Sequence, residues 1–272
     1  MNRIFRTAIL LASLTVVSCS NVQNNVNGPV VLIKTQFGDM KVVLYNETPK
    51  HRDNFLKLAK EGFYDGTLFH RVIKDFMVQG GDPDTKSAQP GQKLGNGGPG
   101  YTIDPEFNPK LLHKRGALAA ARLGDNINPG KKSSGSQFYI VQGQVIPPNQ
   151  VPAFVENANK ELPQKIMNQL AATKRDSFML FQKNNDKPGF DKMVERIKKE
   201  AMAKAAQNPY KLTDEQYHLY TTIGGAPSLD GEYTVFGEVV DGMAVIDSIA
   251  AQQTGSNDRP VKDIKIEVKV VN

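Results

Sequence analysis

The chain has 272 residues, of which 39% are hydrophobic and 23% are charged, a composition typical of a soluble globular protein with one large domain or two small ones. The formal net charge of +6 is modest for this length, so it gives no reason to expect a nucleic-acid partner. The single cysteine, Cys19, excludes a disulfide bond within the chain.

The first 18 residues have the features of a signal peptide. Arg3 and Arg6 supply a positive start, and residues 8–17 form a mostly apolar run that is too short for a comfortable transmembrane helix. The small residues before Cys19 resemble a bacterial lipobox, which predicts cleavage before this cysteine and its acylation. An ordinary signal peptide and an uncleaved anchor are the alternatives. Cleavage would remove two arginines and no acids, so the net charge would fall from +6 to +4.

Residues 19–29 are expected to form a lipidated, flexible tether, because they are polar and rich in asparagine and have little apolar surface to bury. We therefore expect a lipid-anchored protein of the bacterial cell envelope. The absence of aspartate after Cys19 resembles outer-membrane sorting in some bacteria, which favours an outer-membrane protein that faces the periplasm.

The next segment predicts a hairpin and a helix. Residues 30–35 and 40–45 read as two strands joined by a turn that contains Gly38. Thr48 and Pro49 suit the N-cap and first position of a helix, which Gly62 would end. We expect this helix to cap one end of a barrel.

The stretch 69–82, FHRVIKDFMVQGGD, concentrates more chemically distinct side chains than any other segment. Read as a strand, it directs Val72, Phe76 and Val78 to one face, and it directs Arg71, Met77 and Gln79 to the other. The second face would present a cation, a thioether and an amide. His70 is expected to point away from Arg71 and to be structural.

The rest of the chain is mainly strands and loops. Residues 83–100 read as a surface loop, since their glycine-rich run lacks the Lys and Ser/Thr of a phosphate loop and their acids lack the spacing of a calcium loop. No metal and no cofactor are predicted. Strands are expected at 116–122, 136–141, 234–240 and 264–270, with a second capping helix at 243–251. Many short strands with few helices indicate a closed antiparallel barrel.

Residues 145–215 interrupt this pattern and predict an inserted α-helical hairpin. Two apolar stripes at helical spacing are separated by Asp186-Lys187-Pro188-Gly189. Eleven Lys and Arg face seven Asp and Glu between 156 and 206, a net charge of +4. The insertion is either a basic arm that contacts client proteins, peptidoglycan or anionic lipid, or a set of solvated helix faces packed beside the barrel.

Three segments, 69–82, 134–140 (SGSQFYI) and 229–237 (LDGEYTVFG), resemble in their order the motifs of the cyclophilin-type peptidyl-prolyl cis-trans isomerases. The resemblance covers 30–144 and 223–271. It implies a mainly β fold, a closed eight-stranded antiparallel barrel formed by 30–144 and 216–272 and capped by two helices. It also implies isomerisation of X-Pro bonds in Pro-containing segments of unfolded or exported proteins, by a monomer. The alternative function is a non-catalytic chaperone or scaffold that holds such segments through the insertion.

The resemblance also implies the residues of the site. The catalytic residues would be Arg71, Phe76 and Gln79. The substrate-binding residues would be Met77, Ala121, Arg122, Gln137, Tyr139, Leu229 and Tyr233. The role of the arginine also follows from chemistry, because a permanent cation with rigidly held donors can stabilise the nitrogen of a twisted amide.

Three positions depart from the familiar eukaryotic pattern. Tyr139 stands where phenylalanine is usual, so its hydroxyl must find water or a partner. Tyr233 replaces a histidine at the pocket rim, and Ser228 replaces a tryptophan whose indole often binds cyclosporin.

Because Ser228 removes that indole, we expect cyclosporin to inhibit this protein only weakly. The measurement is an inhibition constant in a proline-isomerisation assay. A nanomolar constant would contradict the expectation.

Overall fold

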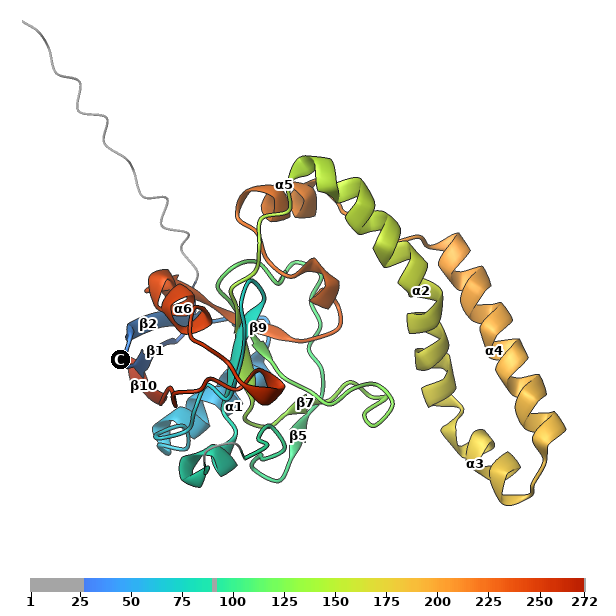
Figure 1. The fold of residues 1–272 in the computed structure, drawn as a ribbon, viewed down its shortest axis with the longest axis horizontal. Coiled ribbons are helices and arrows are strands. Elements are labelled where there is room, and N and C mark those ends of the chain that lie inside the picture. The colour runs from blue at the N-terminus through green and yellow to red at the C-terminus, as the bar shows by residue number, and fades with distance from the viewer. Residues whose placement is uncertain (1–26, 90–91, 272) are drawn as a thin grey trace, which may run out of the picture.

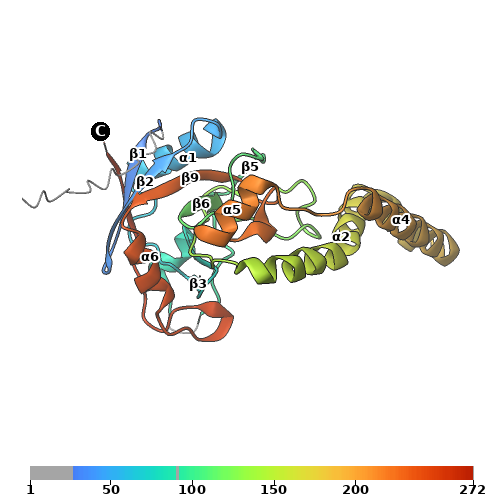
Figure 2. The same cartoon turned by 90° about the horizontal axis from the view of Figure 1, so that it is seen from above.

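The computed structural model describes residues 27–89 and 92–271 (Figures 1 and 2). The expected signal peptide, the lipidation site Cys19 and most of the expected tether lie outside these residues. Within them, no helix combines the length and the apolar character needed to cross a membrane.

The centre of the fold is an eight-stranded sheet in which every neighbouring pair is antiparallel. The strand order is β10-β1-β2-β9-β6-β8-β4-β3. The strands are β1 (Val30–Thr35), β2 (Gly38–Leu44), β3 (Arg71–Ile73), β4 (Met77–Gly80), β6 (Ala117–Ala120), β8 (Phe138–Val141), β9 (Val235–Asp241) and β10 (Glu267–Val271). A separate two-stranded sheet pairs β5 (Thr102–Ile103) with β7 (Ser133–Ser134).

The expected closed barrel is wrong in one respect: the sheet is strongly curled but open. Its edge strands β10 and β3 do not pair with each other. Within the described residues, the only bridge between these edges joins Leu68 to Lys265, just before each strand begins. A ladder needs successive paired residues on both strands, and no residue of β3 is paired with a residue of β10. The sheet is therefore a half-barrel.

The stretch 69–82 is a hairpin rather than one strand. Residues 74–76 form the turn between β3 and β4, and Asp75 adopts a positive φ of 63° within it. Val72 and Val78 do enter the main core, as the alternation predicted. Phe76 does not join them, because it lies in the turn and packs on the opposite face beside Met77.

The two expected capping helices are present as α1 (Pro49–Lys60) and α6 (Met243–Ala250). Phe55 of α1 and Ile246 and Ile249 of α6 are buried in the same cluster as Leu118 and Ile140 of the sheet. This cluster fills the concave side of the curled sheet. Thr48 precedes α1 as predicted, but its side chain makes no capping hydrogen bond.

The insertion contains three helices instead of a simple hairpin: α2 (Val151–Thr173), α3 (Arg175–Lys183) and α4 (Lys187–Gln207). A further helix, α5 (Asp214–Thr222), begins at its end. Helices α2 and α4 pack side by side and project away from the sheet, with α3 at the far end (Figures 1 and 2). We call α2, α3 and α4 the helical arm. Helix α5 returns to the sheet and was not expected.

Short 3-10 turns complete the structure at Pro83–Ser87, Pro148–Gln150, Pro227–Leu229 and Ser256–Asp258. The first of these lies in the segment 83–100 that was expected to be a loop. The buried carboxylate of Asp82 accepts hydrogen bonds from the N–H groups of Gly95 and Gly97, at 2.6 and 3.3 Å. A side chain at residue 97 would collide with this carboxylate, because an added Cβ would lie 2.1 Å from Asp82 Oδ1. Gly95 and Gly97 therefore allow this loop to pack closely against Asp82.

Two histidines are buried in the fold. His51 lies at the start of α1, where its ring nitrogens contact Glu106 Oε2 at 2.7 Å and Ser133 Oγ at 2.9 Å. His70 is 4% exposed, and neither of its ring nitrogens has a hydrogen-bond partner within the described residues. Burial lowers the pKa of both histidines, since it disfavours the charged ring.

The lowered pKa of His70 predicts a loss of stability in mild acid. Below the ordinary histidine value of 6.5, the unfolded chain binds a proton that the native chain resists, so the free energy of unfolding falls as the pH drops through this value. We expect His70→Gln to reduce this pH dependence. Urea unfolding at about pH 5.5 and about pH 7.5 would measure it.

The control is His218→Gln, which replaces an exposed histidine on α5. Identical pH dependence in the His70→Gln variant and in the unmodified protein would contradict the prediction, whatever the effect of the substitution on stability at one pH.

Candidate active site

A cavity of about 450 Å³ opens beside β3, β4 and β8 on the face opposite the main core. Nine of the ten predicted site residues line it: Arg71, Phe76, Met77, Gln79, Ala121, Arg122, Tyr139, Leu229 and Tyr233. Gln137 lines an adjoining cavity of about 640 Å³ instead. The structure therefore brings together residues that are as far as 162 positions apart in the sequence, from Arg71 to Tyr233.

The β3–β4 hairpin places Arg71 directly opposite Gln79. Arg71 Nη1 donates to Gln79 Oε1 at 3.5 Å, and Gln79 Nε2 donates to Gln137 Oε1 at 3.0 Å. Gln137 Nε2 in turn donates to the carbonyls of Gly95 and Gly97, at 3.0 and 2.8 Å. Gln137 thus lies behind Gln79, where it orients the amide that faces the arginine.

Arg71 has a second anchor that sequence reasoning missed. Its Nε donates to Asp258 Oδ2 at 3.3 Å, and both side chains are nearly half exposed. Asp258 lies in the turn Ser256–Asp258 and has a positive φ of 58°. Asp258 belongs to none of the three motifs, and it lies 187 positions from Arg71, so no local pattern links the two residues. Within the described residues, Arg71 Nη2 makes no hydrogen bond, so this donor is available to a ligand.

One part of the cavity lining is formed by apolar and aromatic side chains. Met77 and Tyr139 are almost completely buried, and Phe76, Leu229 and Tyr233 pack against them while remaining partly accessible from the cavity. This arrangement suits a small apolar ring that enters from solvent. His70 was expected to point away from Arg71, but it also borders the cavity, since β3 begins only at residue 71 and strand alternation does not apply to residue 70.

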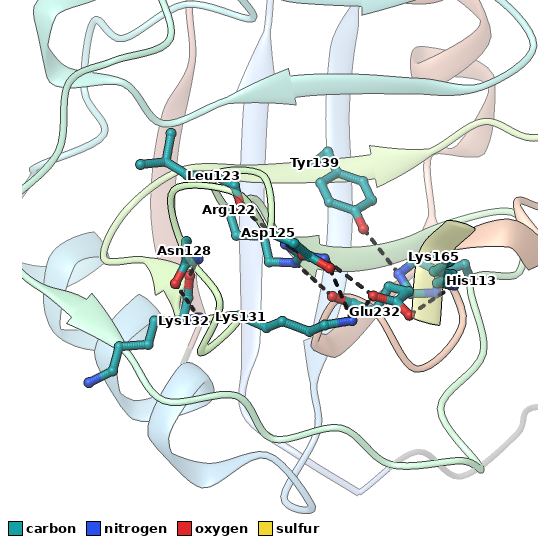
Figure 3. Close-up of polar contacts among 10 residues, drawn as sticks. All are labelled: His113, Arg122, Leu123, Asp125, Asn128, Lys131, Lys132, Tyr139, Lys165 and Glu232. Carbon is teal, nitrogen blue, oxygen red and sulfur yellow. Dashed lines mark hydrogen bonds and ion pairs between the residues drawn. The ribbon is translucent and has the colours of Figure 1, made fainter. Parts of the chain in front are cut away.

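The hydroxyl of Tyr139 has a hydrogen-bond partner within the protein, the ring of His113. It contacts Nε2 of His113 at 3.0 Å (Figure 3). Nδ1 of that fully buried histidine contacts Asp230 Oδ1 at 3.0 Å. Because the carboxylate accepts the Nδ1 proton, Nε2 is left as the acceptor of the tyrosine proton. Burial raises the pKa of Tyr139, so the hydroxyl stays neutral. The sequence showed that a partner was needed but could not identify His113.

Ala121 and Arg122 were expected to bind the substrate, and their backbone groups differ in whether they are free to do so. The backbone of Ala121 is already paired within the protein, since its N–H donates to Gln137 O and its carbonyl accepts from Ser134 N, at 2.9 and 2.8 Å. The backbone N–H of Arg122 makes no hydrogen bond within the described part of the chain. Of the two residues, Arg122 has the backbone donor that a bound peptide could use.

The Arg122 side chain is held beside the cavity rather than pointing freely into it. Its Nε donates to the Glu232 carbonyl at 2.8 Å, and its Nη1 donates to Asp125 Oδ1 at 2.6 Å (Figure 3). The guanidinium lies over the Tyr233 ring, with Cζ 4.6 Å from the ring centroid. This stacking supports the rim of the cavity at a position where Tyr233 departs from the usual histidine.

Comparison with known proteins agrees with this geometry. The model of the cyclophilin type peptidyl-prolyl cis-trans isomerase/CLD family matches residues 30–150 and 172–270. The solved structure of a cyclophilin type peptidyl-prolyl cis-trans isomerase from Cryptosporidium parvum covers 90% of this chain, and the match spans 99% of that protein. Its TM-score is 0.51 and its sequence identity is 22%, which is a similarity of fold.

Two bacterial relatives are similar in sequence. A Streptococcus pyogenes protein, provisionally named as a bifunctional phosphatase/peptidyl-prolyl cis-trans isomerase, is 37% identical over 89% of this chain, which spans only 38% of that relative. A Staphylococcus haemolyticus protein, provisionally named as a peptidyl-prolyl cis-trans isomerase, is 33% identical over 87% of this chain and 88% of its own length. With its three signature segments gathered around one cavity and a family match across most of its residues, the chain belongs to the cyclophilin-type peptidyl-prolyl cis-trans isomerase family.

Proposed function

We propose that this protein catalyses the cis-trans isomerisation of X-Pro peptide bonds and that Arg71 is its principal catalytic residue. The observation that supports this most directly is the position of Arg71. It is held from two sides, by Gln79 and Asp258, in the lining of a cavity that also contains the apolar side chains of Phe76, Met77 and Leu229. A cation above an apolar wall is the arrangement that isomerisation of a prolyl bond requires.

The chemistry needs no bond to break. The barrier to rotation is ~18–20 kcal/mol, because the nitrogen lone pair is delocalised into the carbonyl. In the twisted amide the lone pair is localised on nitrogen and can accept a hydrogen bond. A donor from Arg71 would therefore stabilise the twisted state more than either planar state, which is the requirement for catalysis. We assign this role to Nη2, which makes no hydrogen bond to any residue that the structure describes.

One charged hydrogen bond does not supply the whole effect. Such a bond contributes ~1.5–3 kcal/mol, whereas an acceleration from minutes to milliseconds needs about five powers of ten, or ~7 kcal/mol. We assign the remainder to the wall formed by Phe76, Met77 and Leu229. It would hold the proline ring while the preceding carbonyl rotates, and it would exclude water, which strengthens the arginine contact.

Binding of the peptide backbone would involve Arg122 and Gln137. The backbone N–H of Arg122 could donate to a substrate carbonyl beside the cavity. Gln137 would act mainly by orienting Gln79, since its own amide group is bonded to the glycine loop. Tyr139 would present the face of its ring to the proline while its hydroxyl is held by His113.

We propose further that the substrates are exported proteins and that the enzyme is a lipoprotein anchored through Cys19. The features that support this are the arginines and the apolar run before Cys19 and the polar segment after it. A tether of this kind would let the enzyme reach unfolded chains near the membrane surface. An outer-membrane position facing the periplasm remains part of this proposal.

Arg71→Ala is expected to lower kcat/KM by at least about tenfold, because it removes a contact of ~1.5–3 kcal/mol made mainly in the transition state. A proline-isomerisation assay on the protein from residue 20 onward would measure this. The matched control is Arg196→Ala, which removes an exposed arginine of α4. Full activity of a folded Arg71→Ala variant would contradict the assigned role, and a folded parent protein without turnover would favour a binding scaffold.

Cys19→Ser is expected to abolish lipid attachment, because the hydroxyl cannot replace the thiol as the acylated group. The measurement is the incorporation of a labelled fatty acid into the full chain expressed in a bacterium, followed by detergent-phase partitioning. Equal labelling of the parent protein and the variant, or no labelling of either, would contradict the lipoprotein proposal without affecting the proposed activity.

A further inference from the structure

The helical arm touches the wall of the active site through one lysine. Lys165 of α2 places its Nζ 2.8 Å from Glu232 Oε1 (Figure 3). Glu232 belongs to the segment between Leu229 and Tyr233, and both of those residues line the cavity. The arm therefore makes an ionic contact with the active-site wall, although it projects away from the sheet.

The two oxygens of Glu232 face different parts of the molecule. Oε1 accepts Lys165 from the arm, and Oε2 accepts Arg122 at 3.3 Å together with Lys131. Asp125 pairs with Arg122 and Lys131 as well, at 2.6 and 3.7 Å. The cluster contains three cations and two carboxylates. Glu232 is the carboxylate that pairs both with the lysine of the arm and with the two cations beside the cavity.

Glu232 and Arg122 are more buried than the partners of an ordinary surface pair, whereas Lys165 is 42% exposed. The Glu232 side chain is 13% exposed and that of Arg122 is 5% exposed. The same helix offers a contrast, since Lys160 pairs with Glu156 at 2.7 Å but both side chains are about two thirds exposed. Exposed pairs of this kind contribute little, whereas a partly buried carboxylate depends on its partners. Lys165 and Lys160 therefore provide an internal comparison within one helix.

Arg122 is where the cluster meets the cavity. Its guanidinium is stacked on Tyr233 and is bonded both to the carbonyl and to the carboxylate of Glu232. A shift of Glu232 would move Arg122 and the ring on which it lies. Both residues line the cavity, so the shape of the substrate pocket depends on a carboxylate that does not line it.

A second contact joins α5, the helix that follows the insertion, to residues beside the same cavity. The hydroxyl of Tyr220, on α5, donates to Asp230 Oδ2 at 2.7 Å, and Asp230 Oδ1 contacts the His113 ring that holds Tyr139. The short segment 230–232 thus carries two largely buried acids: Glu232 contacts α2 of the insertion, and Asp230 contacts α5.

We propose that Lys165 and Glu232 are positioning residues, through which the helical arm holds Arg122 and Tyr233 in the arrangement that binds the substrate. This inference rests on the proposed isomerase function. Neither residue touches the reacting atoms in this scheme. Their effect is on peptide binding, because Arg122 and Tyr233 form the rim, whereas Arg71 acts on the twisted bond.

The test compares Lys165→Met with Lys160→Met, two identical changes on α2. We expect Lys165→Met to raise both the KM for a proline-containing peptide and its dissociation constant about three- to tenfold, the range of one coupled contact, with kcat changed less than about twofold. Lys160→Met should change neither quantity. Lys165→Arg should restore binding, since it keeps the charge. Equal KM and dissociation constants for Lys165→Met and Lys160→Met would overturn the proposal.

A double substitution tests whether Lys165 acts through Glu232. Glu232→Gln keeps the size of the side chain and removes its charge. If the two residues form one unit, Lys165→Met has little further effect on peptide binding in the Glu232→Gln protein, whereas an undiminished effect would overturn the coupling. Should Glu232→Gln fail to fold, the comparison of Lys165→Met with Lys165→Arg decides the matter.

The peptide dissociation constant separates this proposal from the proposed function. If the folded parent protein binds the peptide but shows no turnover, the isomerase proposal fails while the effect of Lys165→Met on binding is still measured. If turnover depends on Arg71 but binding is insensitive to Lys165, the isomerase proposal stands and the positioning role fails.

Discussion

The site depends on the register of four antiparallel strands. Pairing of β3, β4, β8 and β6 sets Arg71 opposite Gln79, Gln79 opposite Tyr139, and Tyr139 opposite Ala119. Residues paired in this way point to the same face of a sheet. One row of side chains therefore crosses the sheet, from the guanidinium of Arg71 to the methyl group of Ala119. A slip of one residue in any of these pairs would turn part of the row into the main core.

One face of the sheet carries the main hydrophobic core, and the other carries the candidate binding site. The concave face packs against α1 and α6, in a cluster that contains Phe55, Phe138 and Ile246. The other face carries a smaller cluster around Met77 and Tyr139, which is left open toward the cavity. Since strand residues alternate between the two faces, the same strands that build the stable core also carry the candidate catalytic groups.

The polar groups of the site are held by partners from distant parts of the chain. Arg71 is anchored by Asp258, Tyr139 by His113, and Arg122 by Glu232. Each of these partners is itself charged or titratable, and each lies in or beside a loop, where side chains are not constrained by the sheet. The insertion contacts Glu232 through Lys165, and the helix that follows it, α5, contacts Asp230, so these helices are connected to the residues around the pocket.

The sequence by itself determined the family, most of the strands, both capping helices and half of the residues that line the cavity, because strand alternation and the three motifs are local properties of the chain. It misplaced Phe76, since one strand and a tight hairpin share the same alternation until the turn is known. Whether the barrel closes, where α5 lies, and which partners hold Arg71, Tyr139 and Arg122 were decided only by the tertiary structure. The physical reason is that edge pairing and contacts such as that of Arg71 with Asp258 join residues far apart in the chain, and no local pattern encodes the distance between them.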